Sequence, residues 1–105
     1  MEKSEEKQTK KFVIVRTHSA GVWFGILKSL NGSMAIITEA RRLYYWSGAA
    51  SLSQLAEEGT KKPNDCKFAM VITGEDGVYL PQTIEVLPCT QASVENIQAV
   101  KVWKV

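Results

Sequence analysis

The sequence has few of the residues that build catalytic and metal sites. Its 105 residues include one histidine and two cysteines, and Cys66 and Cys89 lack the spacing of a zinc site. One histidine leaves a single possible base for a serine or cysteine nucleophile, and no pair of acids suggests general acid–base work. Glycine-rich phosphate loops of the P-loop and Rossmann types are absent. We therefore expect no enzyme activity, no catalytic residue, no metal and no cofactor.

An excess of one charge and long apolar runs are also missing. The net charge of +2 does not indicate the broad basic face of a protein that binds duplex nucleic acid. No apolar run is long enough to span a bilayer, and no signal peptide is recognisable. We therefore expect no membrane partner, a cytoplasmic location and free thiols.

What is present favours one small globular domain. Hydrophobic residues make up 45% of the chain. Residues 1–10 are polar and lack periodicity, so we expect a disordered tail followed by a single β-rich domain over residues 11–105. Short β-branched runs between turn signals predict strands at 11–17, 22–30, 33–38, 42–46, 66–73 and 78–87, and helices capped by Ser51 and Thr90. The predicted fold class is α+β, mainly β: a small, strongly bent antiparallel sheet or barrel with one or two short helices.

The most informative segment reads RRLYYWSGAASLSQ and spans residues 41–54. Side chains on a strand alternate between the two faces of the sheet. One face then carries an arginine and two rings: Arg42, Tyr44 and Trp46. The other carries the alternate residues: Arg41, Leu43 and Tyr45. Leu43 indicates that its face is buried, and a slip of one residue would exchange the two faces and move the site to Arg41 and Tyr45.

A predicted helix start follows this strand. Ser51 and Gln54 fit a capping box, and free N–H groups at a helix start suit an anion. Small residues before it would let a ligand or another backbone approach closely. We therefore predict a nucleotide site in which rings stack on bases and cationic or N–H groups hold phosphates. The candidate ligand-binding residues are Arg41, Arg42, Tyr44, Tyr45, Trp46, Ser47, Gly48 and Ser51, with His18 and Trp23 added from a hairpin tip.

Other interpretations of this segment stay open. Small β domains use tyrosine and tryptophan as ordinary core and cross-strand pairs. Exposed rings with arginine also dominate protein interfaces, so the surface could dock on a partner protein or be buried between copies of the chain. Rings with arginine also bind single-stranded nucleic acid, although the low net charge disfavours that function.

The stretch from Phe12 to Trp103 resembles a family of small proteins encoded by phages and prophages. The segments that carry the resemblance are Ser19–Val22, Gly25, Ala40–Arg42, Tyr45–Ala56, Lys62–Pro63, Cys66–Phe68 and Pro88–Thr90. The chain is also similar to the phage anti-CBASS sponge proteins. Those proteins sequester cyclic dinucleotides such as cyclic GMP–AMP without cleaving them, and thereby block a bacterial defence.

The resemblance to the sponge proteins implies several properties of this chain. It implies a homo-oligomer, with a tetramer as the expected form, in the cytoplasm of the host cell. It also implies that Tyr44, Tyr45 or Trp46 stack on bases, while an arginine and the helix start hold phosphates. The competing hypothesis is a phage inhibitor that docks on a host protein through the same aromatic surface.

Overall fold

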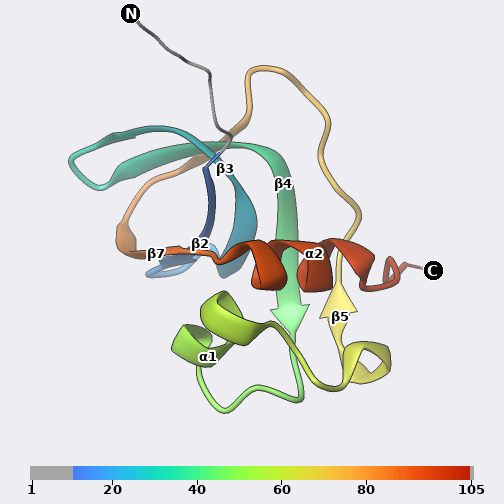
Figure 1. Ribbon diagram of the computed structural model, residues 1–105. Helices are drawn as coiled ribbons and strands as arrows, with labels where there is room; N and C mark the ends of the chain where they lie inside the picture. Colours follow the sequence, from blue (N-terminus) through green and yellow to red (C-terminus); the bar gives the residue numbers. More distant parts are fainter. Residues whose placement is uncertain (1–10, 105) are drawn as a thin grey trace, which may run out of the picture.

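The chain forms a sheet with two short helices on one side, as Figure 1 shows in a computed structural model that describes residues 11–104. The predicted tail at residues 1–10 lies outside the described residues. In chain order the elements are β2 (Phe12–Thr17), β3 (Val22–Asn31), β4 (Met34–Tyr45), α1 (Leu52–Glu58), the 3-10 turn η1 (Pro63–Asp65), β5 (Lys67–Phe68), β6 (Val78–Leu80), β7 (Thr83–Pro88) and α2 (Gln91–Ala99).

The six strands make one antiparallel sheet. Its order is β5-β4-β3-β2-β7, and β6 pairs with β4 beside β5. The strands at the two ends do not pair with each other, so the sheet stays open and is not a barrel. The predicted fold class, mainly β with a bent antiparallel sheet and one or two short helices, is confirmed.

β4 is one strand where the sequence predicted two. Its register with β3 shifts at a β-bulge near Glu39, which has a φ of 50°. Gly25 on β3 lies against this bulge, and a Cβ there would be 2.8 Å from the carbonyl oxygen of Thr38. One extra residue exchanges the two faces of a strand. As a result Ile37 packs on one side of the sheet and Leu43 on the other.

Two other predicted strands are shorter than expected. The stretch predicted at 66–73 forms β5 over two residues and then an irregular edge, where Ile72 bridges to Ala40. The stretch predicted at 78–87 is divided into β6 and β7 by Pro81 and Gln82, and Gln82 has a φ of 58°. Proline at the division agrees with its exclusion from paired strand interiors.

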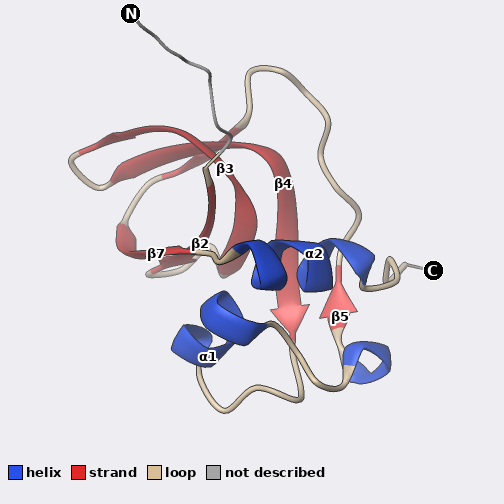
Figure 2. Ribbon diagram, viewed as in Figure 1, coloured by secondary structure: helices blue, strands red, loops and turns tan. Residues whose placement is uncertain are grey.

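Both sides of the sheet contribute to the hydrophobic core. Figure 2 shows the helices gathered on one side, and there they cover the larger cluster of buried residues. The members of this cluster are Ile14, Phe24, Leu43, Leu55, Ala56, Cys66, Phe68, Val94, Ile97 and Val100. The curled strands enclose a smaller cluster on the other side: Val13, Val15, Ala35, Ile37, Ala40 and Leu80. β2 contributes to both clusters, which explains why Val13, Ile14 and Val15 are all fully buried.

The predicted helix caps are confirmed. The Ser51 side chain accepts the N–H of Gln54 at the start of α1, and the Thr90 side chain accepts the N–H of Ser93 at the start of α2. α1 ends at Gly59, which has a φ of 79°. A positive φ suits glycine because it has no Cβ to clash.

Candidate functional site

The side of β4 that faces away from the helices carries exposed rings and cations. Arg42 and Tyr44 are exposed, and Leu43 between them is buried, so the predicted alternation is confirmed for these three residues. We call this surface the open face. Arg42 and Tyr44 lie two positions apart on β4, and each contacts further residues of the surface. The five residues that define the open face are Trp23, Arg42, Tyr44, Lys67 and Trp103.

Arg42 and Trp23 form one end of the open face. The two residues are directly opposite in the β3–β4 ladder, and the guanidinium carbon lies 5.5 Å from the centroid of the indole. The guanidinium also covers Gly21, where a Cβ would be 2.8 Å from Nη2 of Arg42. Within residues 11–104, no carboxylate forms an ion pair with Arg42. Its charge is therefore available to an anionic ligand.

Tyr44, Trp103 and Lys67 form the other end. The rings of Tyr44 and Trp103 stack with centroids 5.1 Å apart and an interplanar angle of 12°. Lys67 Nζ lies 5.4 Å from the centroid of the Trp103 indole. The backbone N–H of Trp103 donates to the carbonyl of Phe68 at 2.9 Å, which holds the C-terminal segment beside β5. Tyr44 is 62% exposed, so the ring face that Trp103 does not cover is open to a stacking base.

Arg41 has a structural role and leaves the candidate ligand set. Its residue exposure is 2%, and its guanidinium donates to the carbonyls of Ala69, Ile97 and Val100 at 2.6–2.7 Å. A longer bond of 3.4 Å reaches the carbonyl of Phe68. Two of these carbonyls lie at the C-terminal end of α2, where a cation is favoured by the helix dipole. Burial lowers the pKa of Arg41, but an arginine in a protein keeps its charge.

Ser47 and Gly48 are half-buried and contact the chain segment at residues 60–66. The carbonyl oxygen of Ser47 accepts a hydrogen bond from the hydroxyl of Thr60. The backbone N–H of Ser47 donates to Cys66 Sγ at 3.5 Å. A Cβ on Gly48 would lie 2.5 Å from the backbone nitrogen of Lys62. The small residues therefore admit another stretch of backbone, which was one of the two possibilities that the sequence left open.

The start of α1 is capped by side chains of its own segment. Gln54 donates its N–H to the Ser51 hydroxyl at 3.1 Å, and its side chain accepts the N–H of Ala50 at 2.8 Å. Ser51 therefore caps α1, while the Gln54 side chain reaches Ala50, one residue before the N-cap whose N–H a capping box would bind. The Ser51 hydroxyl is a cap within the protein, so Ser51 too leaves the candidate ligand set.

Of the remaining predicted residues, Trp46 and His18 lie away from the open face, whereas Tyr45 is opposite Lys67 in the β4–β5 ladder. Trp46 is half-buried against the helix-side core, because the alternation of β4 ends at a register shift between Leu43 and Tyr45. Tyr45 is 51% exposed. His18 is exposed and lines a separate shallow hollow of about 280 Å³ with Gln82, Thr83 and Ile84. The structure thus joins Trp23, Arg42 and Tyr44 with two residues that the predicted site did not include, Trp103 and Lys67.

Trp103 and Lys67 have no local signal that places them in the site. Trp103 lies between two lysines in the sequence KVWK, which is typical of an exposed strand end. Its position against Tyr44 depends on the turn of chain after α2, where Val102 forms a parallel bridge to Phe68. A contact of this kind between distant segments is fixed by topology and not by residue spacing.

The fold and the open face together define a small, open β-sheet domain with a surface of rings and of cations that form no ion pair among residues 11–104. Residues 10–97 match the family described as a domain of unknown function, DUF6948, and the chain belongs to that family. Searches of curated proteins and of solved structures found no match. Across residues 11–104, no group of histidine, cysteine and acidic residues is arranged to hold a metal. No helix in the same residues is long and apolar enough to cross a membrane.

Proposed function

We propose that this protein binds a nucleotide on its open face and holds it without chemical change. The observation that carries the proposal is the Arg42 guanidinium, which forms no ion pair with any described residue and lies two positions along β4 from Tyr44, a stacked and largely exposed ring. Side chains two apart on a strand lie roughly 7 Å from each other on one face. That spacing matches a ligand whose base stacks on the ring while its phosphate meets the guanidinium.

The specific ligand we propose is a cyclic dinucleotide such as cyclic GMP–AMP. The resemblance to phage sponge proteins supports this choice, since those proteins sequester such signals in the host cytoplasm. A second consideration is that the stacked ring pair has a cation at each end, Arg42 on one side and Lys67 on the other. A cyclic dinucleotide has two bases, which rings can stack on, and two phosphates, which cations can bind.

Binding is tested with purified protein and cyclic GMP–AMP. Calorimetric titration should give a saturable heat with the wild-type chain. Tyr44→Ala should weaken binding by roughly tenfold to a hundredfold, because a stacked base contributes about 1–3 kcal/mol. Tyr79→Ala is the matched control, since Tyr79 is 57% exposed on β6 and lies outside the open face. Equal loss in both variants would contradict a specific site.

The absence of turnover is tested on the same complex. Stoichiometric protein is incubated with cyclic GMP–AMP and heated, and the released material is separated by ion exchange. Sequestration predicts that the intact cyclic ligand is recovered. Linear or monomeric products would show that the protein is an enzyme and would overturn this part of the proposal.

A homo-oligomer, with a tetramer as the specific form, is part of the proposal. Several large apolar side chains are exposed in the isolated chain, Met70 at 56% and Ile84 at 55% among them. Association would bury part of this surface. Light scattering should give a multiple of the 11.7 kDa chain mass, and a monomer mass at all concentrations would contradict the oligomer.

A second function, docking on a partner protein, is favoured by one observation. Met70, Val71 and Ile72 are consecutive, apolar and at least 43% exposed, and they lie at the edge of the sheet beyond β5. Apolar surface of this kind is common where proteins associate. Met70→Asp should abolish capture of a host protein if this is the function, and should leave cyclic GMP–AMP binding unchanged if the open face is the functional site.

A further inference from the structure

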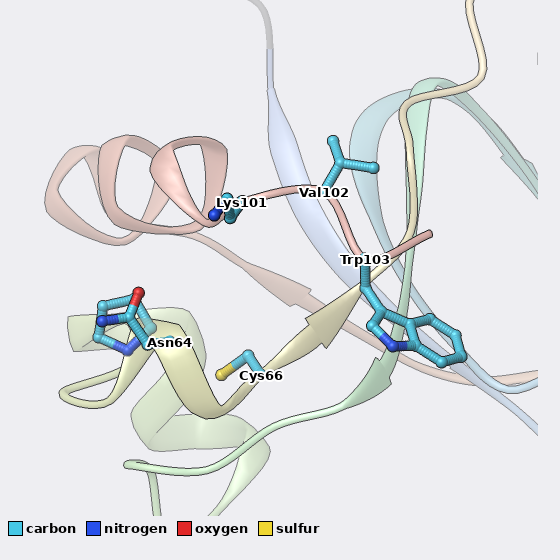
Figure 3. A pocket seen from close by; sticks show the side chains of 6 residues that line it. Asn64, Cys66, Lys101, Val102 and Trp103 are labelled. Carbon is cyan, nitrogen blue, oxygen red and sulfur yellow. The ribbon is translucent and has the colours of Figure 1, made fainter. Parts of the chain in front are cut away.

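A pocket of about 300 Å³ opens beside the ring pair of the open face. It is lined by η1 and the following cysteine on one side and by the C-terminal segment on the other: Pro63, Asn64, Cys66, Lys101, Val102 and Trp103. Figure 3 shows Asn64 and Cys66 on one side of the pocket and Lys101, Val102 and Trp103, from the C-terminal segment, on the other. The volume is at the small end of the range for ligand sites. Trp103 is therefore a wall of this pocket and also the stacking partner of Tyr44.

The excess positive charge of the protein lies around this pocket. Residues 61–67 and 101–104 contain five lysines and one aspartate, a net charge of +4, whereas the whole chain has +2 and the rest of it therefore sums to −2. The five lysines, all exposed, are Lys61, Lys62, Lys67, Lys101 and Lys104. The small net charge of the chain thus conceals a basic corner, because acidic residues elsewhere offset it.

The polar groups at this corner have few partners within the protein. Within the described residues, none of the five lysines forms an ion pair, and among their side chains only that of Lys67 has a contact of this kind, with the Trp103 ring. The side-chain amide of Asn64, which lines the pocket, makes no hydrogen bond in the same residues. Clustered cations that repel one another are stabilised when an anion binds between them.

We propose that this pocket binds a phosphate group of the nucleotide whose base stacks on the face of Tyr44 that Trp103 does not cover. This inference rests on the proposed function and adds a second anion position to it, at the opposite end of the ring pair from Arg42. Lys101, which lines the pocket, supplies the charge, Lys67 adds to it from beside the Trp103 ring that forms the wall, and the Asn64 amide supplies a directed donor. A ligand with phosphates on both sides of its stacked base would contact Arg42 and this pocket together.

The test uses the full chain and two probes, cyclic GMP–AMP and guanosine, which lacks phosphate. Lys101→Ala and Lys67→Ala should each weaken the binding of cyclic GMP–AMP about tenfold, because a charged contact to the phosphate is lost. Both variants should bind guanosine like the wild type, as followed by the indole resonance of Trp103. Lys28→Ala is the matched control, because Lys28 is an exposed lysine in the distant β3–β4 hairpin, and its affinity should stay within about twofold (Figure 1).

The outcomes separate the two proposals. Wild-type affinity for cyclic GMP–AMP in both lysine variants, with loss in Tyr44→Ala, would overturn the phosphate pocket and leave the proposed function standing. Equal weakening of guanosine and cyclic GMP–AMP would also overturn it, since the lysines would then act through the ring pair. No binding of either probe to the wild-type chain would overturn both proposals. A single-stranded oligonucleotide could also compete with cyclic GMP–AMP and bind more tightly. That result would show that the surface binds a nucleic-acid strand, and it would overturn the proposal that Arg42 and the pocket hold two phosphates of one small ligand.

Discussion

Arg41 and Arg42 are neighbours of the same residue type with opposite environments. Arg41 points to the helix side, where its guanidinium is buried and bonded to four backbone carbonyls. Arg42 points to the open face, where it covers Trp23 and has no carboxylate partner among residues 11–104. A guanidinium group therefore stabilises the fold on one face of β4, at Arg41, and is available to a ligand on the other face, at Arg42. The β-bulge at Glu39 determines which arginine does which.

Among the substitutions that test the difference between the two arginines, the largest loss of stability is expected at Arg41. Arg41→Ala should destabilise the fold by roughly 4 kcal/mol or more, because up to four buried carbonyls lose their donor at about 1–3 kcal/mol each. Arg41→Lys should rescue little of this loss, since an ammonium group does not have the planar fork that reaches several carbonyls. Urea unfolding measures both variants. An unfolding midpoint close to that of the wild type would mean that the hydrogen bonds of Arg41 to the four carbonyls contribute little to stability.

A somewhat smaller loss is expected from the apolar part of the same face. Leu43 is 2% exposed in the helix-side core, and Leu43→Ala should cost about 3 kcal/mol through the lost contacts and the cavity. At this chain length the melting temperature should fall by about 4–8 °C for each kcal/mol. An unchanged melting temperature would show that β4 presents its other face to the core.

The division between the two faces could be predicted from the sequence, but its cause could not. Leu43 was enough to indicate which face is buried, and the structure confirms Arg42 and Tyr44 on the other. The single strand with a bulge was predicted as two strands, because Glu39 at a positive φ gives no compositional signal. Gly25 opposite was a correct sign of close backbone approach.

The candidate site was only partly predictable for a similar reason. Residues local to β3 and β4, such as Arg42, Tyr44 and Trp23, follow from alternation and cross-strand pairing. Trp103 and Lys67 come from segments that pack beside β4 only in the complete fold. Ser47 and Gly48 looked like ligand groups because small residues permit close approach, and the approaching group is the backbone at Lys62.

Cys89 provides a pH-dependent test of the helix-side interior. It packs against that core, and burial raises the pKa of its thiol from 9.0 to about 11, with a hydrogen bond to Ser93 opposing the shift. Between these pKa values the unfolded chain is a thiolate while the folded chain keeps its proton. The stabilisation is therefore present below about pH 9 and is lost as the pH rises toward 11.

The measurement compares the wild type with Cys89→Ala, which cannot titrate at this position. The difference in melting temperature between them should narrow as the pH rises from about 9 to 11, because the other titrating groups are common to both proteins. A difference that stays constant across this range would indicate that the thiol is exposed to solvent in the folded protein.

The smallest change in stability is expected at Arg42. Arg42→Ala leaves no cavity and removes a cation–π contact with a half-buried ring, so the free energy of unfolding should change by less than about 1 kcal/mol. Circular dichroism during thermal unfolding measures this change directly. A loss as large as that of Arg41→Ala would erase the distinction between the two arginines.

The central claim is tested most directly by titrating cyclic GMP–AMP into the wild-type chain and into Arg42→Ala in the same calorimeter. If the open face binds the nucleotide, we expect a saturable heat for the wild type and an affinity at least about tenfold weaker for Arg42→Ala, because a charged hydrogen bond to phosphate is lost. Both proteins should melt at nearly the same temperature. Equal affinities, or no heat with the wild-type chain, would contradict the assignment of the open face as a nucleotide site.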